Sequence, residues 1–179
     1  MNKRSDKVLD EWLVLRAQDG DRRSLALLVN RWHKKLVAYA FRKTNDMEAA
    51  KDLVQDSWQA IVKQMYLLQN PSKFRVWAHR IVNNKSVSWI REKQRERRMN
   101  HEIEEEQLGK ASAEMDFGPI RRAVQQLPDK ERTILILFYQ NDYTIKEIAE
   151  ILGINEGTVK SRLFYARKKV KEFYSQQIN

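Results

Sequence analysis

The sequence contains no cysteine, and it has only five glycines and three prolines among its 179 residues. The absence of cysteine excludes disulfide bonds, thiol catalysis and metal sites built on thiolates. The scarcity of glycine and proline leaves few places where a helix is forced to end. No apolar run is long enough to cross a bilayer, and residues 1–12 lack the apolar stretch of a signal peptide. These absences predict a cytoplasmic protein that is mainly helical.

Basic residues outnumber acidic ones. The chain has 34 lysines and arginines against 24 aspartates and glutamates, which gives a net charge of +10 and a pI of about 9.8. Such an excess attracts polyanions, so nucleic acid or an anionic membrane surface is the first partner to consider. The simpler interpretation, a charged surface that keeps the protein soluble, stays open when the charge is considered alone.

Three segments near the N-terminus have apolar residues at helical spacing. They span residues 25–39, 46–68 and 74–89, and a shorter helix is expected over residues 7–18. Asp46 is a suitable N-cap for the second segment, and the polar turn Gln69–Ser72 separates the second from the third. Helices of this kind can bury one another's apolar faces. We therefore expect a first small helical domain over residues 1–95.

The composition changes after about Lys93. A basic stretch is followed by Glu102, Glu104, Glu105 and Glu106, and large apolar residues become rare. This composition predicts a flexible linker over residues 96–118. A second helical domain follows over residues 119–179, so the fold class is all-α, with two small domains. Within it, the segment Thr133–Tyr139 has the composition of a buried strand, but no neighbouring segment alternates with period two, and a buried helix is the preferred interpretation.

A helix-turn-helix is predicted within residues 144–171. Thr144 and Glu147 have the spacing of a capping box, Gly153 stands where a tight turn requires a positive φ, and Asn155 can cap the second helix. The inner face of the first helix is formed by Ile145, Ile148, Ala149 and Leu152, and that of the second by Val159, Leu163, Ala166 and Val170. The small Ala149 lets the two helices approach closely.

The opposite side of the second helix is basic and aromatic. Residues 158–171 include six basic residues (Lys160, Arg162, Arg167, Lys168, Lys169 and Lys171) and no acidic one. A helix of this kind suits the major groove of duplex DNA, with its N-terminal half near the base edges and its flanks near phosphates. The residues expected to bind DNA are Thr158, Lys160, Ser161, Arg162, Phe164, Tyr165 and Lys168. The alternative is an amphipathic helix whose basic face is simply solvated.

A different combination occurs in the third helical segment, where cations are mixed with aromatic and amide side chains. Cations bind phosphates, amides read base edges and aromatic rings stack on unpaired bases, so the combination suits single-stranded DNA. The candidate DNA-binding residues are Phe74, Arg75, Trp77, Arg80, Asn83, Asn84 and Arg91. Phe74, Trp77 and Trp89 are also spaced as core residues of a helix, and for Phe74 and Trp77 a place in the hydrophobic core is the preferred explanation. For the arginines and asparagines, DNA binding is preferred.

Three motifs in this order resemble a known family. The stretches Ala50–Trp58, Phe74–Asn84 and Leu127–Arg132, the last followed by the helix-turn-helix, are similar to bacterial RNA polymerase sigma factors of the extracytoplasmic-function group. The resemblance covers most of the chain. Two positions differ from the usual pattern: Lys51 stands where an acidic residue is common, and Ser88 where an aspartate is common.

The resemblance implies a role for each segment. The first motif would bind the clamp coiled coil of core RNA polymerase through Asp52, Leu53, Gln55, Asp56 and Trp58. The second would open and bind the minus-ten promoter element, and the helix-turn-helix would bind the minus-thirty-five element. An anti-sigma factor, often membrane-anchored in this group, is a further expected partner. Judged without the motif around it, the polar trio of Asp52, Gln55 and Asp56 would be an ordinary solvated face.

No enzymatic site is predicted. The sequence has no phosphate-binding loop, no histidine cluster with metal-ligand spacing and no paired carboxylates in a catalytic setting, so we expect no catalytic residues, no metal and no cofactor. A dimeric helix-turn-helix regulator would explain residues 144–171 but neither of the first two motifs. An RNA-binding or scaffold protein remains a second alternative, and a steep salt dependence with a preference for duplex DNA would argue against it.

Overall fold

The computed structural model describes residues 3–99 and 119–176, and all regular secondary structure within these ranges is helical. The chain divides into two units, Met1–Glu102 and Ile103–Asn179. This agrees with the expected all-α fold. In the described ranges, none of the helices is both long enough and apolar enough to traverse a lipid bilayer.

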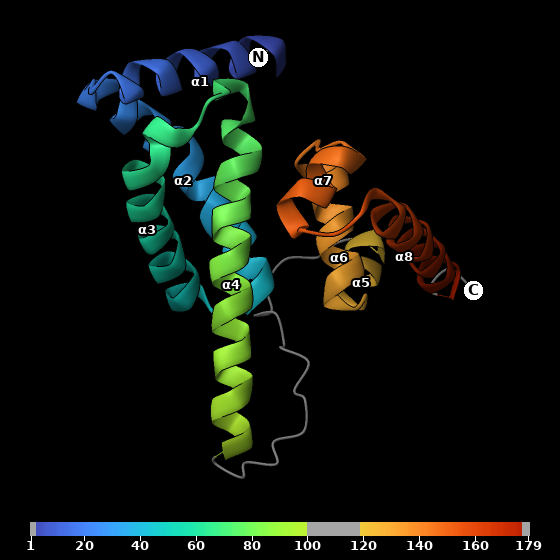
Figure 1. The fold of residues 1–179 in the computed structure, drawn as a ribbon. Coiled ribbons are helices and arrows are strands. Elements are labelled where there is room, and N and C mark those ends of the chain that lie inside the picture. The colour runs from blue at the N-terminus through green and yellow to red at the C-terminus, as the bar shows by residue number, and fades with distance from the viewer. Residues whose placement is uncertain (1–2, 100–118, 177–179) are drawn as a thin grey trace. The chain divides into compact units, whose positions relative to one another are not determined.

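The first unit is a helical bundle. It contains α1 (Lys3–Gln18), α2 (Arg22–Thr44), α3 (Met47–Gln64), the short 3-10 turns η1 (Met65–Leu67) and η2 (Pro71–Lys73), and α4 (Phe74–Met99). Figure 1 shows α2, α3 and α4 packed along one another, with α1 lying across the end of the bundle where α4 begins. The last residues of α4, 91–99, are all exposed, because the helix continues beyond the helices that cover its first half.

Short polar side chains define the ends of these helices. Asp21 caps α2 by accepting hydrogen bonds from the Arg23 amide and the Ser24 hydroxyl, each at 2.9 Å. The predicted cap of α3 is confirmed, since Asp46 accepts a hydrogen bond from the Ala49 amide at 3.0 Å. The predicted continuation of this helix to residue 68 is wrong: α3 ends at Gln64 and the chain tightens into η1.

An aromatic cluster fills the core of this unit. The ring of Phe74 is stacked on Trp58 at a centroid distance of 6.4 Å and meets the edge of Trp32 at 6.1 Å. His79, one turn along α4, packs edge-on against Trp32 at 5.9 Å and Tyr39 at 5.1 Å. These contacts join α2, α3 and α4, and they fix the rotation of α4 about its axis.

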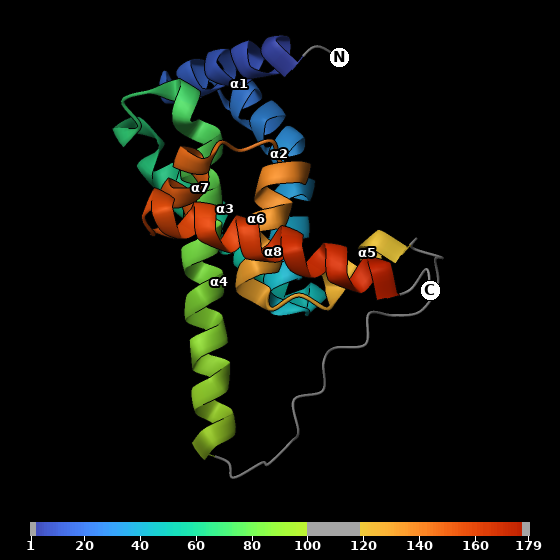
Figure 2. The ribbon, with the colours of Figure 1, turned by 90° about the vertical axis from the view of Figure 1, so that its right-hand side faces the viewer.

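The second unit contains α5 (Pro119–Gln125), α6 (Asp129–Leu135), the π-helical turn η3 (Ile136–Gln140), α7 (Ile145–Leu152) and α8 (Glu156–Gln176). The segment Thr133–Tyr139 is helical, as preferred from the sequence, and Ile134, Leu135, Ile136 and Leu137 are all buried. Helix α8 packs against α5, α6 and α7, and Figure 2 shows it running across α6.

The predicted linker at 96–118 falls partly in a helix. Residues 96–99 are the last residues of α4, and residues 100–118 lie outside the described ranges. Because basic side chains are good helix formers, the charged stretch Arg95–Arg98 extends α4 rather than ending it. The change in composition after Lys93 therefore marks the end of burial and not the end of the helix.

Candidate polymerase and nucleic-acid interfaces

The helix-turn-helix of the second unit is built from local hydrogen bonds. The Thr144 hydroxyl accepts from the Glu147 amide at 3.2 Å, and the Glu147 carboxylate accepts from the Thr144 amide at 2.8 Å, so the predicted capping box is present. Gly153 ends α7 with a φ of +66°, in the left-handed region that favours glycine. The Asn155 side chain then accepts a hydrogen bond from the Thr158 amide at 2.7 Å and caps α8.

The packing of α8 determines which of its faces is free to bind a partner. Val159, Leu163 and Ala166 are buried, and Val170 is half-buried, so the predicted inner face lies against the rest of the unit. Of the seven predicted DNA-binding residues, five are exposed and two, Thr158 and Arg162, are half-buried. The exposed five are Lys160, Ser161, Phe164, Tyr165 and Lys168.

Two aromatic rings lie on the exposed face of α8. Phe164 is 64% exposed and Tyr165 is 56% exposed, and their rings contact each other edge-on with centroids 5.5 Å apart. Large apolar side chains that stand beside cations on an exposed face commonly mark a binding surface. The thymine methyl groups in a major groove offer such rings an apolar contact, and neighbouring lysines can reach phosphates.

The exposed face of α4 carries a second set of candidates. Arg80, Asn84 and Arg91 are exposed, whereas Arg75 and Trp77 are half-buried. Residues 80, 84 and 91 are separated by four and seven positions, and at 3.6 residues per turn these spacings place all three on one side of the helix. The helix therefore presents two cations and an amide in one row.

Two of the predicted DNA-binding residues on α4 are buried instead. Phe74 is 1% exposed and belongs to the aromatic cluster. Asn83 is 4% exposed, and its carbonyl oxygen accepts hydrogen bonds from the Tyr39 hydroxyl at 3.0 Å and the Lys43 ammonium at 2.9 Å. The structure thus separates two adjacent asparagines: Asn83 joins α4 to α2, and Asn84 faces outward. The two partners of Asn83 lie 44 and 40 residues away in the chain, so no local sequence signal distinguishes it from Asn84.

The polar patch predicted on α3 is exposed. Asp52, Gln55 and Asp56 all lie at the surface, and Asp56 is 4.0 Å from the ammonium group of Lys85 on α4. Leu53 beside them is half-buried. Trp58 is 7% exposed and stacks on Phe74, so it supports the helix from within.

The segment between α3 and α4 holds two residues that were not singled out from the sequence. Tyr66 is 71% exposed and Leu67 is 62% exposed, while the preceding Met65 is buried. From the sequence, residue 65 is expected inside a helix and the turn is expected to begin at Gln69. The run Tyr66-Leu67-Leu68 directly before a polar turn was the available signal, because three consecutive large side chains cannot all face one core.

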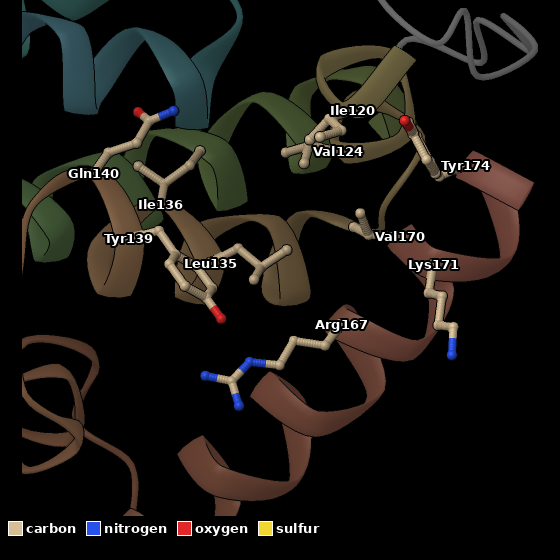
Figure 3. Close-up of a pocket in the computed structure, with 10 residues that line it drawn as sticks. All are labelled: Ile120, Val124, Leu135, Ile136, Tyr139, Gln140, Arg167, Val170, Lys171 and Tyr174. Atoms are coloured by element: carbon tan, nitrogen blue, oxygen red, sulfur yellow. The ribbon is translucent and has the colours of Figure 1, made fainter.

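An apolar groove lies in the second unit between α5, the α6–η3 segment and α8. It has a volume of about 460 Å³, and Figure 3 shows its lining residues from all three elements. The guanidinium of Arg167 lies at its edge, 5.5 Å from the ring centroid of Tyr139 and 5.4 Å from that of Phe138. Lys171 also lines the groove, so an apolar floor is bordered by two cations.

One buried group has a strongly shifted acid–base equilibrium. His79 is fully buried on α4, and its Nδ1 lies 3.1 Å from the carbonyl oxygen of Arg75. Burial lowers the pKa of His79 to about 4, and the positive charges of Arg75, Arg42 and Lys35 act in the same direction. His79 is therefore neutral at physiological pH. Among residues 3–99 and 119–176, no group of three or more His, Asp or Glu side chains is placed to hold a metal ion.

Comparison with known families matches both units. The sigma-70 region 2 family covers residues 28–96, and the sigma-70 region 4 family covers residues 117–170. RNA polymerase sigma factor SigV of Bacillus subtilis is 32% identical over 133 residues, which cover 74% of this chain and 80% of SigV. The ECF RNA polymerase sigma factor SigW of the same organism is 25% identical over 174 residues, covering 89% of this chain and 93% of SigW.

Solved structures show the same fold. The sigma factor RpoE, crystallised with the anti-sigma factor NepR from Bartonella quintana, gives a TM-score of 0.72 at 22% identity, covering 86% of this chain and 98% of RpoE. CnrH, solved with the cytosolic domain of CnrY, gives a TM-score of 0.67 at 22% identity, and the match covers 94% of this chain and 98% of CnrH.

The matched segments coincide with the helices that carry the candidate interfaces. Region 2 covers α3 and most of α4, and region 4 covers the helix-turn-helix. The resemblance found in the sequence is confirmed, and the alternatives of a dimeric regulator and of an RNA-binding or scaffold protein are wrong. The chain belongs to the sigma-70 family, in its extracytoplasmic-function group: it is a promoter-specific initiation factor for RNA polymerase and not an enzyme.

Proposed function

We propose that three exposed surfaces, on α3, α4 and α8, each bind a different partner during transcription initiation. The polar patch on α3 binds core RNA polymerase, the row on α4 binds the melted strand of the minus-ten element, and α8 binds the duplex of the minus-thirty-five element. The first two surfaces belong to the first unit, on α3 and α4, and the third belongs to the second unit, on α8. The observation that carries the proposal is the face of α8 opposite its buried stripe, where lysines and aromatic rings are exposed together on an intact helix-turn-helix.

Binding by α8 follows from its shape and charge. The exposed Lys160 and Lys168 reach phosphates, while Ser161, Phe164 and Tyr165 face the groove. Thr158 and Arg162 flank this face from half-buried positions. The contribution from phosphates makes binding by this unit fall steeply with salt, because each neutralised phosphate releases counterions.

Binding by α4 requires unpaired bases. Arg80 and Arg91 hold the backbone on either side of Asn84, whose amide can pair with a base edge. Arg75 and Trp77 begin this surface, and the buried Phe74 and Asn83 hold the helix in the rotation that presents it. Promoter melting then uses binding energy, since each captured base offsets an unstacking cost of about a few kcal/mol.

Binding by α3 places the chain on the polymerase. Asp52, Gln55 and Asp56 present two carboxylates and an amide along one side of the helix, with the half-buried Leu53 beside them and Trp58 behind. Opposite charge on the polymerase would speed the encounter and fix the register.

The experiment is a binding assay with bacterial core RNA polymerase by native gel or gel filtration. We expect the wild type to co-migrate with core enzyme, and the variant Asp52→Ala/Gln55→Ala/Asp56→Ala to lose co-migration while keeping its helical circular dichroism. The matched control Asp19→Ala removes another exposed carboxylate of the same unit and should bind normally. Equal binding by the triple variant would remove α3 from the polymerase interface.

We also propose an anti-sigma partner and a cytoplasmic location. RpoE was crystallised with the anti-sigma factor NepR, and CnrH was solved in complex with the cytosolic domain of CnrY. Bacterial transcription takes place in the cytoplasm, where a membrane-anchored partner could expose a cytosolic segment. The groove beside α8 offers that segment an apolar floor bordered by Arg167 and Lys171, which suits a helix with one apolar face and acidic flanks.

A further inference from the structure

The turn between α3 and α4 is held by a side chain from far away in the sequence. The amide nitrogen of Gln18, at the end of α1, donates hydrogen bonds to the carbonyl oxygens of Met65 at 2.8 Å and Leu68 at 2.9 Å. These two carbonyls lie at the start and just after the end of η1. One planar amide therefore spans the whole turn and fixes the distance between its two ends.

The position of Gln18 is fixed by the packing and ion pairs of α1. Helix α1 buries Leu13 and Val14 against the bundle, and Arg31 of α2 bonds to Asp10 at 2.8 Å and to Asp6 at 3.0 Å. Directly after Gln18 the chain turns through Gly20, with a φ of +89°, into the capped start of α2. The position of the amide is thus set by packing at both ends of α1.

The turn that Gln18 holds presents its side chains in two directions. Met65 is buried, whereas Tyr66 and Leu67 are exposed. Beyond them, the side chain of Asn70 accepts hydrogen bonds from the amide and hydroxyl of Ser72, and α4 begins at Phe74. Tyr66 and Leu67 therefore lie on a short segment that is held by the hydrogen bonds of Gln18 and Asn70. This segment leads directly into α4, the helix proposed to bind the melted strand.

We propose that Gln18 is a positioning residue for promoter opening. Its amide holds the Met65–Leu68 turn in the conformation that presents the ring of Tyr66, with Leu67 beside it, to an unpaired promoter base. This inference rests on the proposed binding of the melted strand by α4. A ring held in place contributes more to base capture than a mobile one, because its ordering is complete before the base arrives.

The role of Gln18 is tested with holoenzyme reconstituted from the full chain and core RNA polymerase. The probe is a pool of promoter DNA randomised over the minus-thirty-five (upstream) and minus-ten (downstream) elements. The DNA retained in open complexes is sequenced. Gln18→Met keeps the length of the side chain but removes both donors. We expect its base preference at one downstream position to fall about tenfold, with the upstream preference and the affinity for core enzyme unchanged.

Two further variants make the result specific. Tyr66→Ala should reduce the preference at the same downstream position, because it removes the ring that Gln18 positions. Gln126→Met makes the same chemical change at an exposed residue of the second unit and should leave the whole profile unchanged.

Three outcomes would overturn the inference. An unchanged profile in Gln18→Met would show that the turn does not need the amide. An equal loss at both elements, or weakened binding to core enzyme, would show a general structural role. The proposed function fails separately: if Arg80→Ala/Asn84→Ala still opens promoters normally, α4 is not the surface for the melted strand, and the role of Gln18 fails with it.

Discussion

The buried histidine in the first unit should make the stability of that unit depend on pH. Burial lowers the pKa of His79 to about 4, against 6.5 for an exposed histidine, and the charges of Arg75, Arg42 and Lys35 contribute. The hydrogen bond to the carbonyl oxygen of Arg75 opposes this shift but does not overcome it. The ring packs against Trp32 and Tyr39, so a proton on it would place a charge inside the aromatic cluster.

The sign follows from which state binds the proton. Between pH 6.5 and about 4 the unfolded chain protonates this histidine and the folded chain does not, so the free energy of unfolding decreases as the pH falls. The contribution is fully present above pH 6.5 and is lost by about pH 4. The difference between the two pKa values corresponds to about 3 kcal/mol, a large fraction of the stability of a small domain.

The chain contains its own probe for this measurement. All five tryptophans, at positions 12, 32, 58, 77 and 89, lie in the first unit, so tryptophan fluorescence of the full chain follows the unfolding of that unit alone. Urea titrations from about pH 7.5 to about pH 4.5 should show the wild type losing about 1.4 kcal/mol of unfolding free energy per pH unit below pH 6.5 from this group.

The comparison is made with His79→Gln, which cannot titrate. This variant will be less stable at neutral pH because the aromatic cluster is repacked. The pH dependence assigned to His79 should nevertheless disappear, so the test is the slope of the free energy of unfolding against pH and not its value at one pH. His33→Gln, a half-buried histidine on α2, is the matched control and should keep the wild-type slope. Parallel pH profiles for the wild type and His79→Gln would refute the reasoning.

Substitutions at four other positions, 83, 84, 144 and 153, give further tests. Asn83→Ala removes the acceptor of two buried or half-buried hydrogen bonds and should cost about 2 kcal/mol in urea unfolding, whereas Asn84→Ala should change stability little and reduce the yield of open complexes in permanganate footprinting. Thr144→Ala breaks the capping box and should cost about 1 kcal/mol, measured by circular dichroism as the unfolding of the second unit. Gly153→Ala should destabilise that unit by about 1 kcal/mol through backbone strain alone, because an added Cβ meets no atom within 4 Å; Gly153→Asn, which tolerates this φ, should cost less.

The parts of the fold that depend on a few neighbouring residues were predictable. The caps at Asp46, Thr144 and Asn155 and the turn at Gly153 each need only a side chain and a backbone group within three or four positions. For the same reason the inner stripe of α8 was placed correctly: a helix with spacings of four, three and four has only one way to bury it.

The parts that depend on the rotation of a helix in the bundle were not predictable in the same way. Helix α4 has buried residues at 74, 76, 78, 79, 82, 83 and 86, a face wide enough to include one of two adjacent asparagines. Composition cannot show which of Asn83 and Asn84 is buried, because the two residues have the same helix propensity and the same polarity. The outcome is decided by Tyr39 and Lys43, which lie 44 and 40 residues away in the chain. The hydrogen bonds from Gln18 to the α3–α4 turn were unpredictable for the same reason, since their acceptors lie 47 and 50 residues away in the chain.

Separate surfaces on two units also explain how modest contacts can give a selective protein. A row of three side chains on α4 and one face of α8 are each small compared with a typical specific DNA interface, so neither unit alone should bind promoter DNA tightly. In the proposed arrangement, polymerase holds the chain through α3, so the second promoter element is bound at a high effective concentration and the two affinities multiply. Weakening either proposed DNA surface should then lower the affinity for the promoter by the same factor by which it lowers the affinity for the isolated element. Weakening the α3 patch should abolish selection at both elements together.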